Sequence, residues 1–494
     1  MKNPWGIHWF RRDLRILGNI ALQKNAKKTN GCTLGLFCFD SKFLSRSDFS
    51  HNRFAFFLQT LLSLKNELKD HGGDLLVIDC LPQEAFPLLL NHCKRHKISP
   101  PSLVTWGRDY EPYARSRDAA IEKILSNLKV PFLHLRDHLL FEPHEVLKND
   151  KSGDFYKVYS PFNRKWHELL LRPIGKERIY SPIRTSDFFK KNNFIFKIKW
   201  SNLNIKEQPP FVDKLETFIK HNSEKTTITI PDAGFLAAYK QLKIFQSKIL
   251  DYNKKRDFPA ILGTSRISIF LKNGSLTVPQ IISFLHLNHP HLGTQNGGNV
   301  FLNELIWREF YYSILYHHPQ VENKSFLPQY ENLQWENNRS FFSRWKEGTT
   351  GFPIVDAGMR QLVQTGWMHN RVRMIVASFL VKDLLIDWKW GEKYFMHQLL
   401  DGDLASNNGG WQWVASTGCD PQPYFRIFNP WLQSLKFDAE GTYIKTYVPE
   451  LRDVPAQALH QAHANRNPSK YPTPMVNHSI QKEKAIRLYK HPSL

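Results

Sequence analysis

Short apolar runs alternate with longer amphipathic stretches over the first 135 residues of the chain. The apolar runs have the length of β-strands and the stretches between them have helical periodicity, an alternation typical of parallel βαβ units. Strands are predicted at residues 7–10, 33–39, 75–79, 103–106 and 132–135. Helices are predicted at residues 20–27, 53–70 and 116–128. Residues 1–135 are therefore expected to form an α/β domain around a parallel sheet.

The pattern changes after residue 135. Between residues 136 and 230 the periodicity weakens and lysine, asparagine and proline accumulate, which predicts an interdomain linker. Helical patterns broken by glycine and proline fill residues 231–460 with little strand signal, so an all-helical domain is expected there. Residues 461–494 are rich in histidine, asparagine, proline and lysine and are expected to form a loosely packed C-terminal tail. The predicted fold class is α/β plus α.

Two segments of the helical region carry a polar and aromatic face opposite their apolar stripe. On a helix drawn through residues 366–380, this face holds Trp367, Asn370, Arg371 and Met374. In residues 301–312 it holds Glu304, Trp307, Arg308 and Tyr311. A carboxylate, indoles and guanidinium groups on one face suit a nucleotide ligand. A solvated face with a salt bridge between Glu304 and Arg308 is the alternative.

Two further segments combine glycine with hydrogen-bonding side chains. Residues 401–416 contain two aspartates, adjacent asparagines and a glycine pair, and residues 407–410 are expected to break a helix and let the backbone approach a ligand. Asp401 and Asp403 can accept hydrogen bonds from ring N–H groups or ribose hydroxyls. A metal site is the alternative, disfavoured because His397 lacks a ligand spacing. Residues 263–268 place hydroxyls before an apolar helix, where backbone N–H groups bind phosphate, although Ser and Thr are also ordinary N-caps.

Composition narrows the class of partner. The 494 residues include 67 Lys and Arg against 45 Asp and Glu, and this net charge of +22 predicts a polyanionic partner. Nucleic acid is the first candidate, and an acidic membrane surface or simple solubility charge is the alternative. Five cysteines with no CxxC pair disfavour disulfides and zinc and indicate a reducing cytoplasm. No signal peptide or membrane span is expected, and an apolar fraction of 41% excludes a disordered chain.

Five segments, in chain order, resemble the photolyase and cryptochrome family, above all its class I members that act on cyclobutane pyrimidine dimers. They are FRRDLR at 10–15, RDFPAILGTSRIS at 256–268, NELIWREF at 303–310, GWMHNRVRM at 366–374 and DGDLASNNGGWQW at 401–413. The resemblance spans about residues 5–455 and implies a Rossmann-like antenna domain, a linker and a helical FAD-binding domain. It also implies a monomer that repairs UV-damaged DNA by electron transfer from photoexcited reduced FAD. A blue-light cryptochrome photoreceptor and a (6-4) photolyase are the alternatives.

The same resemblance implies roles for individual residues. The implied FAD-binding residues are Tyr252, Thr264, Ser265, Arg266, Ile267, Ser268, Trp367, Asn370, Arg373, Asp401, Asp403 and Asn407. The implied DNA-binding residues are Arg256, Glu304, Trp307, Arg308, Asn370, Arg371, Trp413, Arg426 and Gln433. The implied catalytic residues at the flavin and the flipped-out dimer are Glu304, Trp307, Met374 and Asn407. Trp335, Trp388 and Trp411 match a chain that passes electrons from the surface to FAD.

Three positions affect which member of the family, and which antenna chromophore, the resemblance implies. By the resemblance, Asn407 faces flavin N5, and an amide where plant cryptochromes carry Asp favours repair over photosensing. Glu111 matches an acid that contacts a methenyltetrahydrofolate antenna, but the lysine expected after His318 and Pro319 is displaced, so a deazaflavin antenna stays an alternative. Phe301 stands where the family often has Trp, which keeps an aromatic ring at that position.

Overall fold

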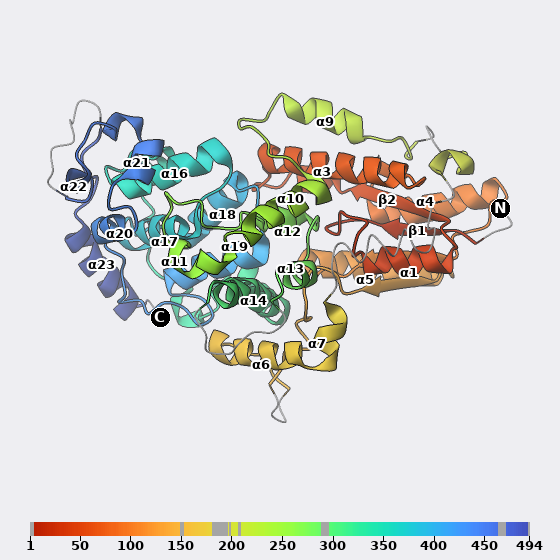
Figure 1. The fold of residues 1–494 in the computed structure, drawn as a ribbon, viewed down its shortest axis with the longest axis horizontal. Helices are drawn as coiled ribbons and strands as arrows, with labels where there is room; N and C mark the ends of the chain where they lie inside the picture. Colours follow the sequence, from red (N-terminus) through yellow and green to blue (C-terminus); the bar gives the residue numbers. More distant parts are fainter. Residues whose placement is uncertain are drawn as a thin grey trace.

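Figure 1 shows the computed structural model, which describes residues 4–148, 153–179, 196, 199–205, 209–287, 296–462 and 471–492. An α/β domain with the N-terminus occupies one end of the molecule, and a helical domain with the C-terminus occupies the other (Figure 1). Separate apolar clusters form the cores of the two domains. The predicted fold class is therefore confirmed.

The sheet of the α/β domain has five parallel strands in the order β3-β2-β1-β4-β5. They are β1 (Gly6–Trp9), β2 (Thr33–Phe39), β3 (Leu75–Asp79), β4 (Leu103–Gly107) and β5 (Phe132–Leu135), and each lies where it was predicted, with ends shifted by at most one residue. The first four strands are almost wholly buried, which is why they form continuous apolar runs in the sequence. The helices of this domain are α1 (Ile20–Lys28), α2 (Ser41–Leu44), α3 (His51–Asp70), α4 (Pro82–Arg95) and α5 (Pro112–Asn127).

The strand order reverses between β1 and β4, and the residues that follow these two strands meet at the same edge of the sheet. This edge faces the helical domain. Leu14 N donates to the carbonyl of Asn273 at 3.3 Å, and Arg15 Nη1 donates to the carbonyl of Gly274 at 3.0 Å. The sheet topology thus places Arg12 and Glu111, which follow β1 and β4, at the boundary between the domains.

The predicted linker contains helices that pack on both domains. They are α6 (Tyr159–Leu171), α7 (Pro173–Arg178), the 3-10 helix η1 (Trp200–Leu203) and α9 (Leu215–Ser223). Trp166 is fully buried, and its Nε1 donates to Glu309 of the helical domain at 2.6 Å. Trp200 is buried against the sheet, where its Nε1 donates to the carbonyl of Gly35 at 2.8 Å. The weak periodicity hid this secondary structure, and residues 149–152, 180–195, 197–198 and 206–208 lie outside the described residues.

The helical domain has no strand among its described residues between 231 and 460, as predicted. Its α-helices are α10 (Gly234–Gln246), α11 (Tyr252–Lys255), α12 (Ser268–Asn273), α13 (Val278–Phe284), α14 (Gly297–His317), α15 (Arg339–Glu347), α16 (Pro353–Thr365), α17 (Asn370–Ser378), α18 (Trp388–Gln398), α19 (Leu404–Ala415), α20 (Pro430–Phe437), α21 (Thr442–Tyr447) and α22 (Ala456–Leu459). A π-helix, η5 (Phe379–Asp383), extends α17. Across the described ranges, every helix is too short or too polar to cross a membrane.

The C-terminal segment is packed, not loose, over residues 471–492. Its helix α23 (His478–Lys490) buries Ala485 and Tyr489, which lie one helical turn apart. Gln481 Nε2 donates to the carbonyl of Asp383 at 2.7 Å, and Tyr489 Oη donates to the carbonyl of Ala415. The expectation of a loosely packed tail is therefore wrong for these residues, and residues 463–470 and 493–494 lie outside the description.

Two predictions about local helix structure are also wrong. Gly366, with φ of 64°, ends α16, so the next helix begins at Asn370 and not at residue 366. Residues 407–410 do not break a helix but lie inside α19. A Cβ at Gly409 would lie 2.1 Å from the Tyr311 ring, so glycine allows α14 and α19 to touch. Packing offsets the cost of about 1 kcal/mol that each glycine brings to a helix.

Candidate active site

Helices α12, α14, α17 and α19 surround a cavity of about 490 Å³ in the helical domain. The predicted site residues that line it are Tyr252, Arg256, Ser265, Ile267, Ser268, Glu304, Trp307, Arg308, Asn370, Arg373, Met374, Asp401, Asp403, Asn407, Trp411 and Trp413. Phe301 lines it too and packs on Tyr252, with ring centroids 5.4 Å apart. The apolar stripes of α14 and α17 are buried in the cores, so the two-faced character predicted for these helices is confirmed.

Other predicted site residues do not line this cavity. They are Glu111, Thr264, Arg266, Trp335, Trp367, Arg371, Trp388, Arg426 and Gln433. Trp367 precedes α17 and therefore does not share a helical face with Asn370 and Met374, contrary to the prediction. The Arg266 guanidinium stacks on Trp367 at 4.3 Å, and both residues border a second cavity of about 560 Å³. Arg426 is exposed in a loop, and Gln433 is half-buried on α20.

We call the polar part of the cavity formed by Ser268, Arg373, Asp401 and Asp403 the floor. Its two carboxylates are buried, and Ser268 and Arg373 are half-buried. Asp401 accepts hydrogen bonds from Ser268 Oγ at 2.7 Å and from Arg373 Nη2 at 2.9 Å. Arg373 is held in turn by its Nε, which donates to the carbonyl of Met368 at 2.8 Å. A carboxylate with donors from two helices presents a fixed acceptor for ring N–H or ribose hydroxyl groups.

Asp403 is the N-cap of α19, where its Oδ1 accepts from the backbone N–H of Ser406 at 3.1 Å. Its Oδ2 accepts from Arg12 Nη2 at 2.8 Å and from Tyr312 Oη at 2.5 Å. Burial alone would raise the pKa of this carboxyl, but the charges of Lys272 and Arg12 hold the pKa well below its ordinary value. Asp403 therefore stays ionised at the floor.

We call the half-exposed part of the cavity, formed by Arg256, Glu304, Trp307 and Asn370, the mouth. Glu304 pairs with Arg256 Nη1 at 2.6 Å, so the salt bridge to Arg308 considered as an alternative is not formed. The Trp307 ring stacks on Tyr159 of α6 with centroids 3.6 Å apart and planes 5° apart. One face of this indole is thereby covered, and a planar ligand can only stack on the other.

Arg308 points inward. Its Nη1 donates to the carbonyl of His138 at 3.2 Å, and its guanidinium lies 4.9 Å from the ring centroid of Tyr312. Its Nη2 is buried and has no hydrogen-bond partner among the described residues. Arg308 also lines the cavity, and its role in DNA binding stays a prediction.

Sequence reasoning missed two residues of the site. Lys272 lines the floor and follows Ser268 by one helical turn, so the i, i+4 spacing on α12 was a signal for it. Tyr159 supports Trp307 from the predicted linker, and its hydroxyl donates to the carbonyl of Asn303 at 3.0 Å. No local pattern marks Tyr159, because its role depends on a partner that is distant in the sequence.

The three candidate electron-transfer tryptophans belong to one apolar cluster. Trp411 lines the cavity, Trp388 is buried, and Trp335 is half-buried at the edge of the cluster. Trp411 and Trp388 are thus both buried, and Trp335 is the one of the three that is partly exposed. Their role in electron transfer stays a prediction.

Comparison with known proteins gives the family of this chain. Residues 301–491 match the model of the FAD binding domain of DNA photolyase, and residues 6–179 match the DNA photolyase model. The deoxyribodipyrimidine photo-lyase of Alkalihalophilus pseudofirmus is 38% identical over 98% of this chain and 97% of its own length. The chain therefore belongs to the DNA photolyase family.

Solved structures agree with this assignment. The bacterial class III photolyase from Agrobacterium tumefaciens superimposes with a TM-score of 0.79 at 30% identity, over 99% of this chain and 98% of its own. The archaeal photolyase from Sulfolobus tokodaii, solved with two FAD molecules, superimposes with a TM-score of 0.76 at 30% identity, over 98% of this chain and 99% of its own.

The cavity fits the FAD that the family model implies. A Cβ placed at Gly410 would meet no atom within 4 Å, so this glycine leaves space beside α19. The buried Nη2 of Arg308 lacks a partner among the described residues, and an anionic group can supply one. Ionised Asp403 and the Asp401 carboxylate offer acceptors for ring N–H and hydroxyl groups. The donor and acceptor set therefore suits a large dinucleotide.

Proposed function

We propose that this protein splits cyclobutane pyrimidine dimers in UV-damaged DNA, driven by light and with reduced FAD as cofactor. The observation that carries the proposal is a single cavity that joins a floor with two buried carboxylates to a half-exposed mouth with a carboxyl group, an indole and an arginine. The floor suits the cofactor, and the mouth suits a dimer of two adjacent bases turned out of the duplex. The name of the relatives and the match to an FAD-binding domain support this division.

At the floor, the residues of this chain bind and orient the cofactor. FAD, when bound and reduced, supplies light absorption and an electron that returns at the end, so no net redox change occurs. Asp401 and Arg373 are fixed by their mutual hydrogen bonds. Asn407 Nδ2 donates to the carbonyl of Glu392 at 3.0 Å, which orients the amide and leaves its Oδ1 to accept from a flavin N–H.

At the mouth, Trp307 and Met374 offer an apolar wall for the flipped-out dimer. Trp307 stacks on the dimer through the face that Tyr159 leaves open. Glu304 is placed to hydrogen-bond a thymine carbonyl of the dimer, an interaction that strengthens as negative charge develops on the dimer. Both carbon–carbon bonds of the cyclobutane ring then break, and the electron leaves the products.

DNA is held by charge around the mouth. Arg371 pairs with Asp257 at 2.9 Å, and Arg256 pairs with Glu304. Both pairs are partly exposed, so their arginines can exchange a carboxylate for a DNA phosphate at low cost. Arg426 and Gln433 complete the proposed DNA contacts, and the net charge of +22 adds long-range attraction to the phosphates.

Trp335, Trp388 and Trp411 are proposed to return FAD to its reduced state under light. Indole is readily oxidised. Trp411 lines the cavity, and Trp335 is the one of the three that is partly exposed and so can take an electron from a reductant in solution. Trp335→Phe should slow photoreduction of oxidised FAD but leave repair by chemically reduced protein unchanged. Loss of repair in the pre-reduced variant would contradict this separation of roles.

We further propose a methenyltetrahydrofolate antenna at Glu111. Glu111 Oε1 accepts from Arg12 at 2.7 Å and from Lys272 at 3.3 Å, which leaves Oε2 for a ring N–H donor. A deazaflavin and a second FAD, as in the Sulfolobus tokodaii structure, are the alternatives. The absorption spectrum of the chromophores released by denaturation distinguishes a folate or a deazaflavin from FAD, and two FAD molecules per chain would indicate a second FAD. A single FAD per chain with no other chromophore would contradict an antenna.

The experiment that tests the main proposal uses protein reduced with dithionite and UV-irradiated oligothymidine. Dimers lack the base absorbance near 260 nm, so repair restores it. We expect recovery under blue light and none in the dark. No recovery from a reduced, flavin-loaded sample would contradict the proposal and favour a photoreceptor or a (6-4)-specific enzyme.

A further inference from the structure

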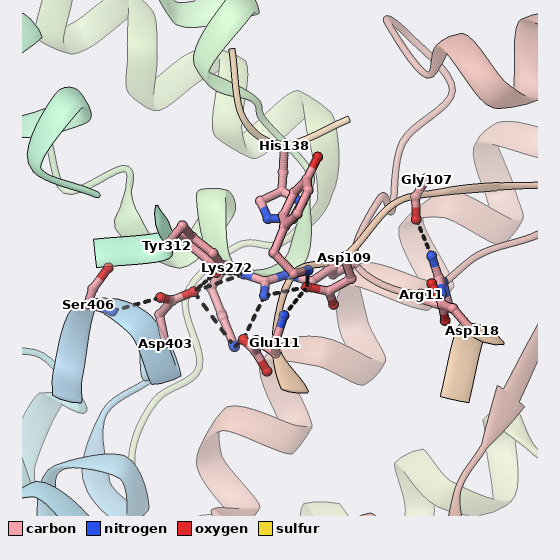
Figure 2. A network of polar contacts seen from close by, with 12 residues as sticks. Arg11, Gly107, Asp109, Glu111, Asp118, His138, Lys272, Tyr312, Asp403 and Ser406 are labelled. Carbon is pink, nitrogen blue, oxygen red and sulfur yellow. Dashed lines mark hydrogen bonds and ion pairs between the residues drawn. The ribbon is translucent and has the colours of Figure 1, made fainter. Parts of the chain in front are cut away.

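Arg12 connects the α/β domain to the flavin cavity. Its Nη1 donates to Glu111 at 2.7 Å within its own domain. Its Nη2 donates to Asp403 at 2.8 Å and to Tyr312 Oη at 2.6 Å, both in the helical domain. Figure 2 shows Glu111, Lys272, Asp403 and Tyr312 gathered at this boundary, joined by dashed contacts. One guanidinium thus bridges carboxylates of both domains through its two Nη atoms. The Lys272 ammonium lies beside it, 3.3 Å from Glu111 and 3.8 Å from Asp403, and shares both carboxylates.

The position of Arg12 is itself fixed. Gly274, which ends α12 with φ of 76°, packs so closely that a Cβ there would lie 1.8 Å from the Arg12 carbonyl oxygen. On the next residues, Leu14 N and Arg15 Nη1 donate to the end of α12. The backbone of Arg12 therefore cannot move relative to the helical domain without breaking these contacts.

Asp403, which accepts a hydrogen bond from Arg12, fixes the start of α19. Asp403 caps this helix through Oδ1, and its backbone carbonyl accepts from Asn407 N at 2.8 Å, the hydrogen bond that starts the helix. Asn407 and Trp411 lie one turn apart on α19, and both line the cavity. A shift of Asp403 therefore changes where Asn407 and Trp411 sit against a bound cofactor.

We propose that Arg12 is a positioning residue for the flavin cavity: it holds Asp403, and through Asp403 the start of α19, from the opposite domain. This inference rests on the proposed function because it treats Asn407 as a flavin contact. Tyr312 belongs to α14, the helix of Glu304 and Trp307, so the same guanidinium also ties the helix of the mouth to the floor. The α/β domain thus contributes to the flavin site without touching it.

The test compares Arg12→Gln with Arg11→Gln, a matched control in the neighbouring residue. Arg11 is buried and binds Asp118 and the carbonyl of Gly107, so its bonds stay within the α/β domain. Arg12→Gln should raise the FAD dissociation constant about tenfold, as expected for loss of a charged hydrogen bond. It should also speed hydrogen exchange of the Ser406 and Asn407 amides about tenfold in protein stripped of FAD. Arg11→Gln should change both quantities by less than about twofold.

Equal effects of the two variants, or unchanged exchange in Arg12→Gln, would overturn the inference. If Arg12→Gln does not fold, Arg12→Lys gives the result, because it keeps the charge but has one donating nitrogen where the guanidinium uses two. It should weaken FAD binding about threefold and loosen the same two amides, and wild-type exchange would overturn the proposal. Wild-type protein that binds no FAD would instead contradict the proposed function. The hydrogen-exchange measurement would still test whether Arg12 stabilises the start of α19.

Discussion

The floor and the mouth of the cavity use the same kinds of side chains, but they differ in burial and in the number of partners. The Asp401 side chain is 4% exposed and accepts from Ser268 and Arg373. The Glu304 side chain is 31% exposed and pairs with Arg256 alone. The two arginines are similarly exposed, Arg373 by 25% and Arg256 by 21%, so the difference lies in the carboxylates. A buried carboxylate that loses its donors is costly, whereas one in contact with water is not. The floor carboxylate is therefore fixed by its donors, whereas the carboxylate of the mouth can change its partner at low cost.

The largest effect is expected at the floor. Asp401→Ala removes an acceptor and leaves the Arg373 guanidinium and the Ser268 hydroxyl without it. A hydrogen bond to a charged group contributes about 1.5–3 kcal/mol, so FAD affinity should fall about ten- to a hundredfold. Flavin absorbance of the purified variant measures this loss. Asp257→Ala, which breaks a pair near the mouth, is the control and should keep its flavin.

His369 links the two regions, because it caps α17, which carries Asn370 at the mouth and Arg373 at the floor. Its Nδ1 accepts from the backbone N–H of Arg371 at 3.2 Å, so the cap needs the neutral ring. Burial, aided by the charges of Arg371 and Arg373, lowers the pKa of His369 to about 4.

This pKa predicts how stability depends on pH. Between pH 6.5 and 4, the unfolded chain binds a proton on this histidine that the folded chain does not. The free energy of unfolding should therefore fall by up to about 3 kcal/mol as the pH drops through this range. His369→Asn keeps a capping side chain and should remove this part of the pH dependence in denaturant titrations. An identical slope in both proteins would contradict the assignment.

Substitution of Glu304 at the mouth should have a smaller effect than substitution of Asp401 at the floor. Glu304→Ala should lower the repair yield per absorbed photon about tenfold, because one hydrogen bond to developing charge is lost. FAD content should stay unchanged, in contrast to Asp401→Ala. Glu304→Gln retains a donor and should recover part of the yield. An unchanged yield in Glu304→Ala would show that this carboxyl does not act on the dimer.

The smallest effect is expected for a single DNA contact. Arg371→Gln should weaken binding of damaged and undamaged duplex alike, by a few-fold. The slope of log affinity against log salt should fall by about one, because one phosphate contact is lost. Arg46→Gln is a matched control, since Arg46 pairs with Asp48 on the surface of the α/β domain. A loss of affinity for damaged DNA alone would show that Arg371 contacts the lesion and not an ordinary phosphate.

The α/β domain was predictable from sequence because its signals are local. Buried parallel strands produce apolar runs, and each strand was placed to within one residue. The face of Glu304 and Trp307 was also predictable, since helical periodicity separates it from Ile306 and Phe310. The resemblance to a known family, and not periodicity, supplied the cofactor and the roles of the residues.

The remaining features depend on contacts between distant segments. Gly409 suggested a helix break, but it serves the close approach of Tyr311 from another helix. Arg12 contacts Asp403 although 391 positions separate them. Tyr159 covers Trp307 from a segment that lacked a periodic signal. Such pairings follow from tertiary packing and leave no local pattern in the sequence.

The most direct test is a structure of the FAD-loaded protein bound to a duplex that contains one thymine dimer. The account predicts that the dimer leaves the duplex and lies against Glu304 and Trp307. The pair between Glu304 and Arg256 should be open, while the contacts of Asp401 with Arg373 and Ser268 stay as they are here. A dimer that remains stacked in the duplex above an unchanged mouth would contradict the account.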